Sequence, residues 1–195
     1  MLLGYAVPRR DVRPLAHALL RHFGSLPQVL GASYENLIAF PGVGPGIAIF
    51  LKLVNDIIMC GYRDMLATRP VFHKIENLYN YCKWNLANKT VEEFHVLYLD
   101  DKFRLIQDQT HSVGTVDSSS VYVREIVKRA LELNAKSVVL VHNHPVSNDG
   151  FSTMDMDATA EVQRMLKNVG VTVFDHLLVD KFTVSSARGL GYMHD

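Results

Sequence analysis

Residues 142–155 read HNHPVSNDGFSTMD, and this stretch connects two segments of different character. Before it, residues 137–141 (SVVLV) form a short apolar run that is typical of a buried strand. After it, residues 154–168 repeat apolar side chains at helical spacing. The sequence therefore predicts a buried strand that ends near residue 142, followed by a loop and a helix.

Two histidines lie at the end of this strand, and a carboxylate lies in the first turn of the helix. His142 and His144 point to the same face if the chain is extended, because residues two apart share a face of a strand. Pro145 favours an extended conformation for His144, since the residue before a proline avoids the α region. With Asp155 these side chains give three ligands, the number that a catalytic zinc site uses while it keeps a fourth position for water.

Each part of the pattern also has an ordinary structural explanation. A histidine near a strand end is commonly a polar surface group, and a motif alone is a hypothesis. Ser152 and Asp155 have the spacing of a helix cap, in which the serine binds free amides and the carboxylate lies at the positive helix end. Capping and ligation are compatible, because a cap would hold Asp155 in place for a metal ion.

The composition is that of a soluble globular protein. The 195 residues are 48% apolar and 21% charged, which is ordinary for this class. No uninterrupted apolar run reaches the roughly 18 to 20 residues of a membrane span, and the first residues lack the order of a secretory signal. Cys60 and Cys82 have no metal-type spacing, so we expect free thiols, a cytoplasmic location and no membrane contact.

The chain divides by pattern into a helical domain at residues 1–69 and a second domain at residues 70–195. Residues 1–70 carry seven Lys/Arg and four Asp/Glu, a net charge of +3. Residues 71–195 carry thirteen and sixteen, a net charge of −3. The asymmetry supports two domains with different roles, and it is too small to establish nucleic-acid binding.

A glycine-rich turn lies in the first domain, where residues 41–44 read PGVG between two predicted helices. It resembles the helix-hairpin-helix motif of non-specific DNA binders, in which Gly42 and Gly44 would open backbone amides towards a phosphate. DNA-binding members usually carry Lys or Arg directly after the second glycine, whereas here Pro45 and Gly46 follow and only Lys52 is near. Non-specific DNA contact and a packing or partner-docking role both remain open, because such binding is driven mainly by charge.

The second domain begins with an amphipathic helix at residues 73–87 and then changes to strands. Residues 94–99 and 103–106 read as an antiparallel hairpin, and residues 120–134 read as a helix. After the helix at 154–168, residues 171–174, 175–176, 177–180 and 182–184 read as short terminal strands.

Further motifs surround the histidine stretch, namely Glu92-x-Phe94, Leu97-Tyr98-Leu99-Asp100, Arg124-Glu125-Ile126-Val127, Ala130-Leu131-Glu132-Leu133-Asn134-Ala135 and Asp175-His176. Together with His142-x-His144-Pro145 and Ser152-x-x-Asp155, they resemble the JAMM (MPN+) metalloprotease family, and most closely its RadC-like branch. The likeness covers nearly the whole chain. It implies an α/β (α+β) fold with a mixed curved sheet flanked by helices, preceded by a small all-helical helix-hairpin-helix module.

The resemblance also implies roles for individual residues. His142, His144 and Asp155 would hold one Zn²⁺ per chain, Glu92 would act as general base, and Ser152 would hydrogen-bond the developing oxyanion. The implied reaction is hydrolysis of an amide or isopeptide bond in an unknown protein or peptide substrate. The chemistry is coherent, because zinc lowers the pKa of bound water to about 7 and a carboxylate can accept its proton.

Two assignments keep an alternative. Glu93 is adjacent to Glu92, and only one of the two can point to the metal because neighbours on a strand face opposite sides. The Glu-x-Phe spacing of the family favours Glu92. Asp175 and His176 are either a pair that orients a metal ligand or a polar pair without a role in the site.

The chain departs from the family pattern in the loop between the ligands. The RadC-like branch usually has Ser-Gly where this chain has Val146 and Ser147, and proline where it has Phe151. Gly150 would supply the backbone freedom that Ser147 lacks. These changes concern substrate contacts and rate more than metal binding.

Three hypotheses follow. The first is a zinc-dependent metallopeptidase of the JAMM type. The second is a DNA-associated repair or accessory protein that binds DNA through the helix-hairpin-helix. The third is a catalytically silent metal-binding scaffold.

Overall fold

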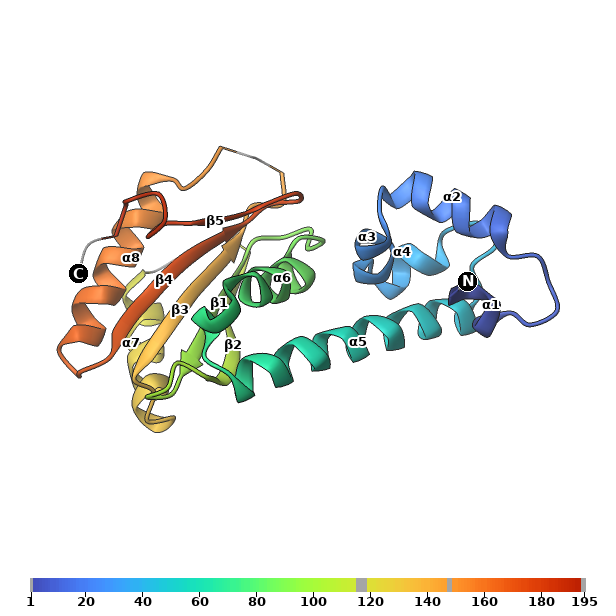
Figure 1. Ribbon diagram of the computed structural model, residues 1–195. Helices are drawn as coiled ribbons and strands as arrows, with labels where there is room; N and C mark the ends of the chain where they lie inside the picture. Colours follow the sequence, from blue (N-terminus) through green and yellow to red (C-terminus); the bar gives the residue numbers. More distant parts are fainter. Residues whose placement is uncertain (1, 115–118, 147–148, 194–195) are drawn as a thin grey trace. The chain divides into compact units, whose positions relative to one another are not determined.

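The computed structural model describes residues 2–114, 119–146 and 149–193 of the chain. Contacts between residues divide the chain into two compact units, Met1–Gly61 and Tyr62–Asp195. Each unit has its own buried side chains. Figure 1 shows the helices and strands of both units.

The first unit is built from short helices and the start of a long one, namely α1 (Leu2–Ala6), α2 (Arg13–Phe23), α3 (Leu26–Gly31), α4 (Tyr34–Ile38) and α5 (Pro45–Thr68). Serine side chains cap two of them, because Ser25 accepts from the Gln28 amide and Ser33 accepts from the Asn36 amide. Leucine side chains of α2, α3, α4 and α5 are buried in this unit.

Helix α5 begins in the first unit and ends in the second. Among the described residues it is long and apolar enough to cross a membrane by length and composition alone. A single helix of this kind is weak evidence for a membrane span. The helix also carries charged residues along its length, including Lys52, Asp56 and Asp64.

The second unit is a mixed α+β fold that continues from the end of α5, as predicted. Its elements are η1 (Val71–Lys74), α6 (Ile75–Leu86), β1 (Glu93–Leu99), β2 (Leu105–Val113), α7 (Ser119–Glu132), β3 (Ser137–Asn143), α8 (Thr153–Lys167), β4 (Thr172–Val179) and β5 (Val184–Ser186). The strands form one sheet in the order β2-β1-β3-β4-β5. Among the strands that the structure describes, only β3 and β4 pair in parallel, and α8 supplies the crossover that a parallel pair needs.

Helices lie on both faces of this sheet (Figure 1). Helices α7 and α8 bury one face, where Ile126, Val162 and Leu166 pack on Val138 and Leu140 of β3. Helix α6 lies on the other face. Because both faces are covered, every residue of β3 is buried, which agrees with the unbroken apolar run in its sequence.

The short strands predicted near the C-terminus are partly joined in the structure. One continuous strand, β4, includes Asp175 and His176 and has a register shift against β3 between Val138 and Val139. Both polar residues are buried with partners: the Asp175 carboxylate accepts from Ser186 and Arg188, and His176 bonds Thr159 and His142. A satisfied polar side chain does not interrupt a strand.

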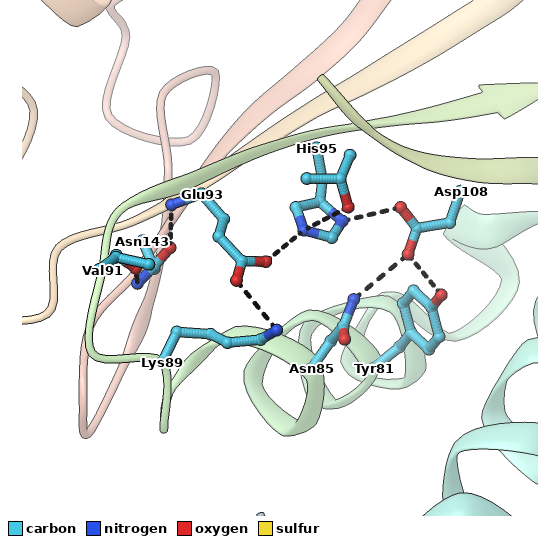
Figure 2. A network of polar contacts seen from close by, with 9 residues as sticks. Tyr81, Asn85, Lys89, Val91, Glu93, His95, Asp108 and Asn143 are labelled. Atoms are coloured by element: carbon cyan, nitrogen blue, oxygen red, sulfur yellow. Dashed lines mark hydrogen bonds and ion pairs between the residues drawn. The ribbon is translucent and has the colours of Figure 1, made fainter. Parts of the chain in front are cut away.

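A network of charged groups lies between the sheet and α6 (Figure 2). The His95 ring lies between two carboxylates, with Nδ1 3.0 Å from Asp108 Oδ1 and Nε2 3.0 Å from Glu93 Oε2. The Thr110 hydroxyl lies 3.2 Å from the same Nε2. Lys89 forms an ion pair with Glu93, while Tyr81 and Asn85 of α6 donate to Asp108. An imidazole with a carboxylate at each nitrogen is stabilised as the doubly protonated cation.

The charges of this network shift pKa values in opposite directions. Burial alone would lower the pKa of His95, but the hydrogen bonds and charges of Asp108 and Glu93 outweigh it and raise the pKa above its usual value. Burial would raise the pKa of Glu93, but His95 and Lys89 outweigh it and lower that pKa. The raised pKa of His95 and the lowered pKa of Glu93 both favour the charged forms of this ion pair.

We expect the free energy of unfolding to decrease as pH rises above about 6.5, the ordinary pKa of histidine. A raised pKa in the folded state means that the stabilisation by His95 is complete below that pH and is lost as pH rises through the folded value. His95→Gln should destabilise the protein by about 3–5 kcal/mol, the usual cost of breaking a buried ion pair. Denaturant unfolding between pH 6 and 9 measures both effects, with exposed His73→Gln as control. A wild-type slope no steeper than that of His95→Gln would contradict this account.

Candidate metal centre

The two histidines and the aspartate come together where β3 meets the N-terminus of α8. His142 is buried at the end of β3, and His144 follows it one step beyond the strand. Asp155 lies in the first turn of α8. One ligand atom from each of the three residues lies within 4.8 Å of the others. The folded chain thus brings together the three residues that the sequence singled out as ligands.

The spacing of the ligand atoms suits a single metal ion. His142 Nε2 is 3.2 Å from His144 Nε2 and 3.3 Å from Asp155 Oδ1, and His144 Nε2 is 3.7 Å from Asp155 Oδ2. Tetrahedral ligands about 2.0–2.1 Å from a zinc ion lie roughly 3.3 Å apart. Three acceptor atoms this close repel one another unless a proton or a metal ion lies between them.

Hydrogen bonds determine which nitrogen of His142 carries the proton. The Thr159 hydroxyl donates to the Asp155 backbone carbonyl at 2.5 Å, so its oxygen accepts from His176 Nδ1 at 2.6 Å. His176 Nε2 then has no proton and accepts from His142 Nδ1 at 2.8 Å. His142 Nε2 faces the other two ligand atoms, where it would offer its lone pair to a metal ion or, when it carries a proton instead, donate that proton to Asp155 Oδ1 at 3.3 Å.

The pKa values of both partners of His142 are lowered. Burial, followed by the charge of His142, holds the pKa of His176 well below its usual value, so His176 is neutral. Burial would raise the pKa of Asp155, but hydrogen bonds from His142 and Ser152 outweigh it and hold the pKa of this carboxyl well below its usual value. Asp155 is therefore ionised and able to ligate a cation.

Ser152 and Asp155 form the predicted helix cap. The Asp155 amide donates to Ser152 Oγ at 3.1 Å, and the Ser152 amide donates to Asp155 Oδ2 at 2.7 Å. The Ser152 hydroxyl also donates to Oδ2 at 2.7 Å. The cap fixes the Asp155 rotamer and holds Oδ2 through the backbone even if the hydroxyl turns elsewhere.

Aromatic rings form the wall of the centre. The Phe151 ring centroid lies 5.8 Å from that of His142 and 5.2 Å from that of His176. Phe94 stacks on His142 at 6.4 Å from within the sheet. Phe151, which replaces the usual proline of the family pattern, therefore shields the hydrogen bond between the two histidines from water.

The two neighbouring glutamates have different surroundings. Glu93 is buried and bonded to His95 and Lys89 on the α6 side of the sheet. Phe94 pairs with His142 across the sheet and stacks on its ring, and Glu92 lies two residues before Phe94. Glu93 thus points away from the metal centre, whereas Glu92 is exposed directly before β1, and its placement at the centre stays a prediction.

The remaining predicted residues lie in several places. His176 contacts His142, whereas Asp175 lies on the opposite face of β4 and binds Ser186 and the Arg188 amide. Val146 is almost fully exposed, and Ser147 lies outside the described residues. Gly150 has a positive φ of 76°, as its proposed role in the loop requires.

The glycine turn of the first unit lies between α4 and α5. Gly42 has a φ of 87°, and the Gly44 carbonyl accepts from the Ala48 amide at the start of α5. The Lys52 ammonium group donates to the Ala32 carbonyl at 3.1 Å, so it makes a hydrogen bond inside this unit. DNA contact through Gly42 and Gly44 stays a prediction.

Sequence reasoning missed two residues near the centre, Thr159 and Asn143. Thr159 lies four residues after Asp155 on α8, one helical turn away, and that spacing could have pointed to it. The partners of Asn143 lie about fifty residues earlier in the chain. Only the register of the sheet places them together.

Comparisons with known proteins agree with the geometry. The sequence model of the family described as "RadC-like JAB domain" matches residues 72–192. The chain is 39% identical over 193 residues to a UPF0758 protein of Ruegeria pomeroyi, covering 99% of this chain and 86% of the relative. It is 38% identical over 188 residues to a UPF0758 protein of Fusobacterium nucleatum, covering 93% of this chain and 81% of the relative.

Proposed function

The chain belongs to the RadC-like JAB domain family, and on this basis we propose that it is a zinc-dependent hydrolase of amide or isopeptide bonds. The observation that carries the proposal is the convergence of His142 Nε2, His144 Nε2 and an Asp155 oxygen on one point. Two imidazoles and a carboxylate form a common catalytic zinc set with an open fourth position.

The residues of the chain divide the work of hydrolysis. Bound zinc supplies a Lewis acid that polarises a carbonyl and lowers the pKa of a water ligand to about 7. Glu92 accepts a proton from the attacking water and returns it to the leaving amine. The Ser152 hydroxyl turns away from Asp155 and donates to the carbonyl oxygen of the substrate. Asp155 Oδ2 keeps its hydrogen bond from the Ser152 amide meanwhile. We expect this chemistry in the cytoplasm, in line with the free thiols of Cys60 and Cys82.

A hydrolysis screen tests the proposal. The purified full chain, loaded with one zinc ion per chain, is incubated with a peptide library and with a lysine-linked isopeptide library, and products are read by mass spectrometry. We expect cleavage that a zinc chelator abolishes and that added zinc restores. Cleavage that persists in the chelated protein and in Glu92→Gln would contradict the proposed mechanism.

Thr159→Val is expected to weaken zinc binding by about 10-fold or more. Valine keeps the shape of threonine but removes the oxygen that accepts from His176 Nδ1, and loss of such outer partners typically costs 10–100-fold in metal affinity. Thr159→Ser keeps the hydroxyl and serves as the control. Competition with a fluorescent zinc chelator measures both affinities, and equal values for the two variants would refute the role of the hydroxyl.

A further inference from the structure

We propose that Asn143, the residue between the two histidine ligands, is a positioning residue that fixes Glu92 beside the metal centre. The inference rests on the proposed function, because it concerns the general base of that reaction. It is carried by three hydrogen bonds to the backbone around Glu92 and by the buried ion network beneath it (Figure 2).

The Asn143 side chain binds the backbone on both sides of Glu92. Its Oδ1 accepts from the Glu93 amide at 2.8 Å, and its Nδ2 donates to the Val91 carbonyl at 3.1 Å. The Glu92 carbonyl accepts from the Gly114 amide at 2.7 Å. We call these three hydrogen bonds the Glu92 clamp.

The clamp determines where the Glu92 side chain points. The Val91 carbonyl belongs to the peptide plane before Glu92, while the Glu92 carbonyl and the Glu93 amide belong to the plane after it. Each peptide unit is rigid, so fixing both planes fixes the two backbone dihedrals of Glu92 and the direction of its Cα–Cβ bond. The backbone is held at three points, and the side chain is left exposed.

Backbone pairing holds Asn143, the residue that supports this clamp. Backbone pairing between β1 and β3 ends at Phe94 and His142, and the Asn143 side chain continues the contact one step further. Asn143 itself pairs with Val179 of β4, and the next amide, that of His144, donates to the Val179 carbonyl at 3.0 Å. Residues 142–144 thus carry two of the proposed metal ligands and also hold the backbone of the general base Glu92.

The side chain must provide both a donor and an acceptor, which among compact side chains of this length is a property of the asparagine amide. Asparagine is only 1% exposed here, so loss of the amide would leave the Val91 carbonyl and the Glu93 amide without their partner. The Glu93 side chain is in addition held by Lys89 at 2.9 Å and by His95 at 3.0 Å. The segment around Glu92 is therefore held both through its backbone and through the side chain of the next residue.

The functional consequence concerns the base more than the ligands. If the clamp is lost, Glu92 samples positions away from the centre, while His142 and His144 remain held by β4, His176 and the strand. A displacement of about 1 Å of a reacting group can reduce turnover by about 100-fold. Metal binding should change much less.

The first test uses the metal-free, ¹⁵N-labelled full chain and needs no substrate. In Asn143→Leu, which has a similar volume, we expect the Glu93 amide to exchange with solvent at least about 10-fold faster relative to the Val96 amide. Asn143→Asp, which keeps the acceptor but not the donor, should retain most of this protection and is the second variant if Asn143→Leu does not fold. Val139→Ala, a buried change on the same face of β3, controls for lost stability and should alter both amides equally.

The second test uses cobalt(II) alone as a probe in the same proteins. We expect the pseudocontact shift of the Glu92 amide to fall to less than half in Asn143→Leu, while the shift of Val96 stays as in wild type. The positioning role would be overturned if the Glu92 amide of Asn143→Leu kept the pseudocontact shift of wild type, or if Val139→Ala lowered that shift as much as Asn143→Leu does. If wild type binds no cobalt(II), the proposed function fails, and the exchange of Glu93 alone then decides whether the clamp exists.

Discussion

The Asp155→Asn variant is expected to bind zinc more than about 100-fold more weakly than wild type. Asparagine keeps the size of the side chain and an oxygen for the helix cap, but it removes the negative charge that faces His142 and His144. Loss of an outer partner alone costs 10–100-fold in metal affinity, so loss of a charged ligand should exceed that range. Competition with a zinc chelator at neutral pH measures the change.

Asp157→Asn is the matched control for this variant. Asp157 lies on the same helix two residues later and is exposed, so its replacement should leave zinc affinity within about 2-fold, as is typical of exposed sites. Circular dichroism confirms that α8 is folded in both proteins. Equal affinities of Asp155→Asn and wild type would exclude Asp155 as a ligand.

Glu92→Gln is expected to reduce turnover by about 100- to 10,000-fold and to leave one zinc ion bound per chain. Glutamine has the shape of glutamate but cannot accept a proton, and general base catalysis contributes a factor of this size. The measurement is kcat on a substrate from the library screen, with zinc content determined on the same samples.

Glu93→Gln separates the two neighbouring glutamates. Its carboxylate binds His95 and Lys89 on the opposite face of the sheet, so its loss should lower stability and leave kcat within a few-fold at a temperature where the variant is folded. A large loss of kcat in Glu93→Gln together with wild-type kcat in Glu92→Gln would reverse the assignment.

The cluster of His142, His144 and Asp155 could be predicted from the sequence because local rules place its members. An apolar run predicts the buried strand, alternation puts His142 and His144 on one face, and the cap spacing puts Asp155 in the first turn of α8. The structure contains each of these local features. The mixed sheet flanked by helices also agrees with the fold that the family resemblance implied.

The supporting contacts could not be predicted because they depend on the register between distant segments. The Glu92 clamp joins residues about fifty positions apart, and the hydrogen bond from His142 to His176 joins β3 to β4. The partners of Asp175 and His176 likewise come from other elements, namely Ser186 of β5 and Thr159 of α8, and both side chains are buried.

The account therefore depends on a metal ion at the end of β3. The most direct test is elemental mass spectrometry of the full chain, purified without added metal. We predict about one zinc ion per chain, the content of a single three-ligand site with an open fourth position. A folded protein without zinc that also fails to bind added zinc tightly would contradict the central claim.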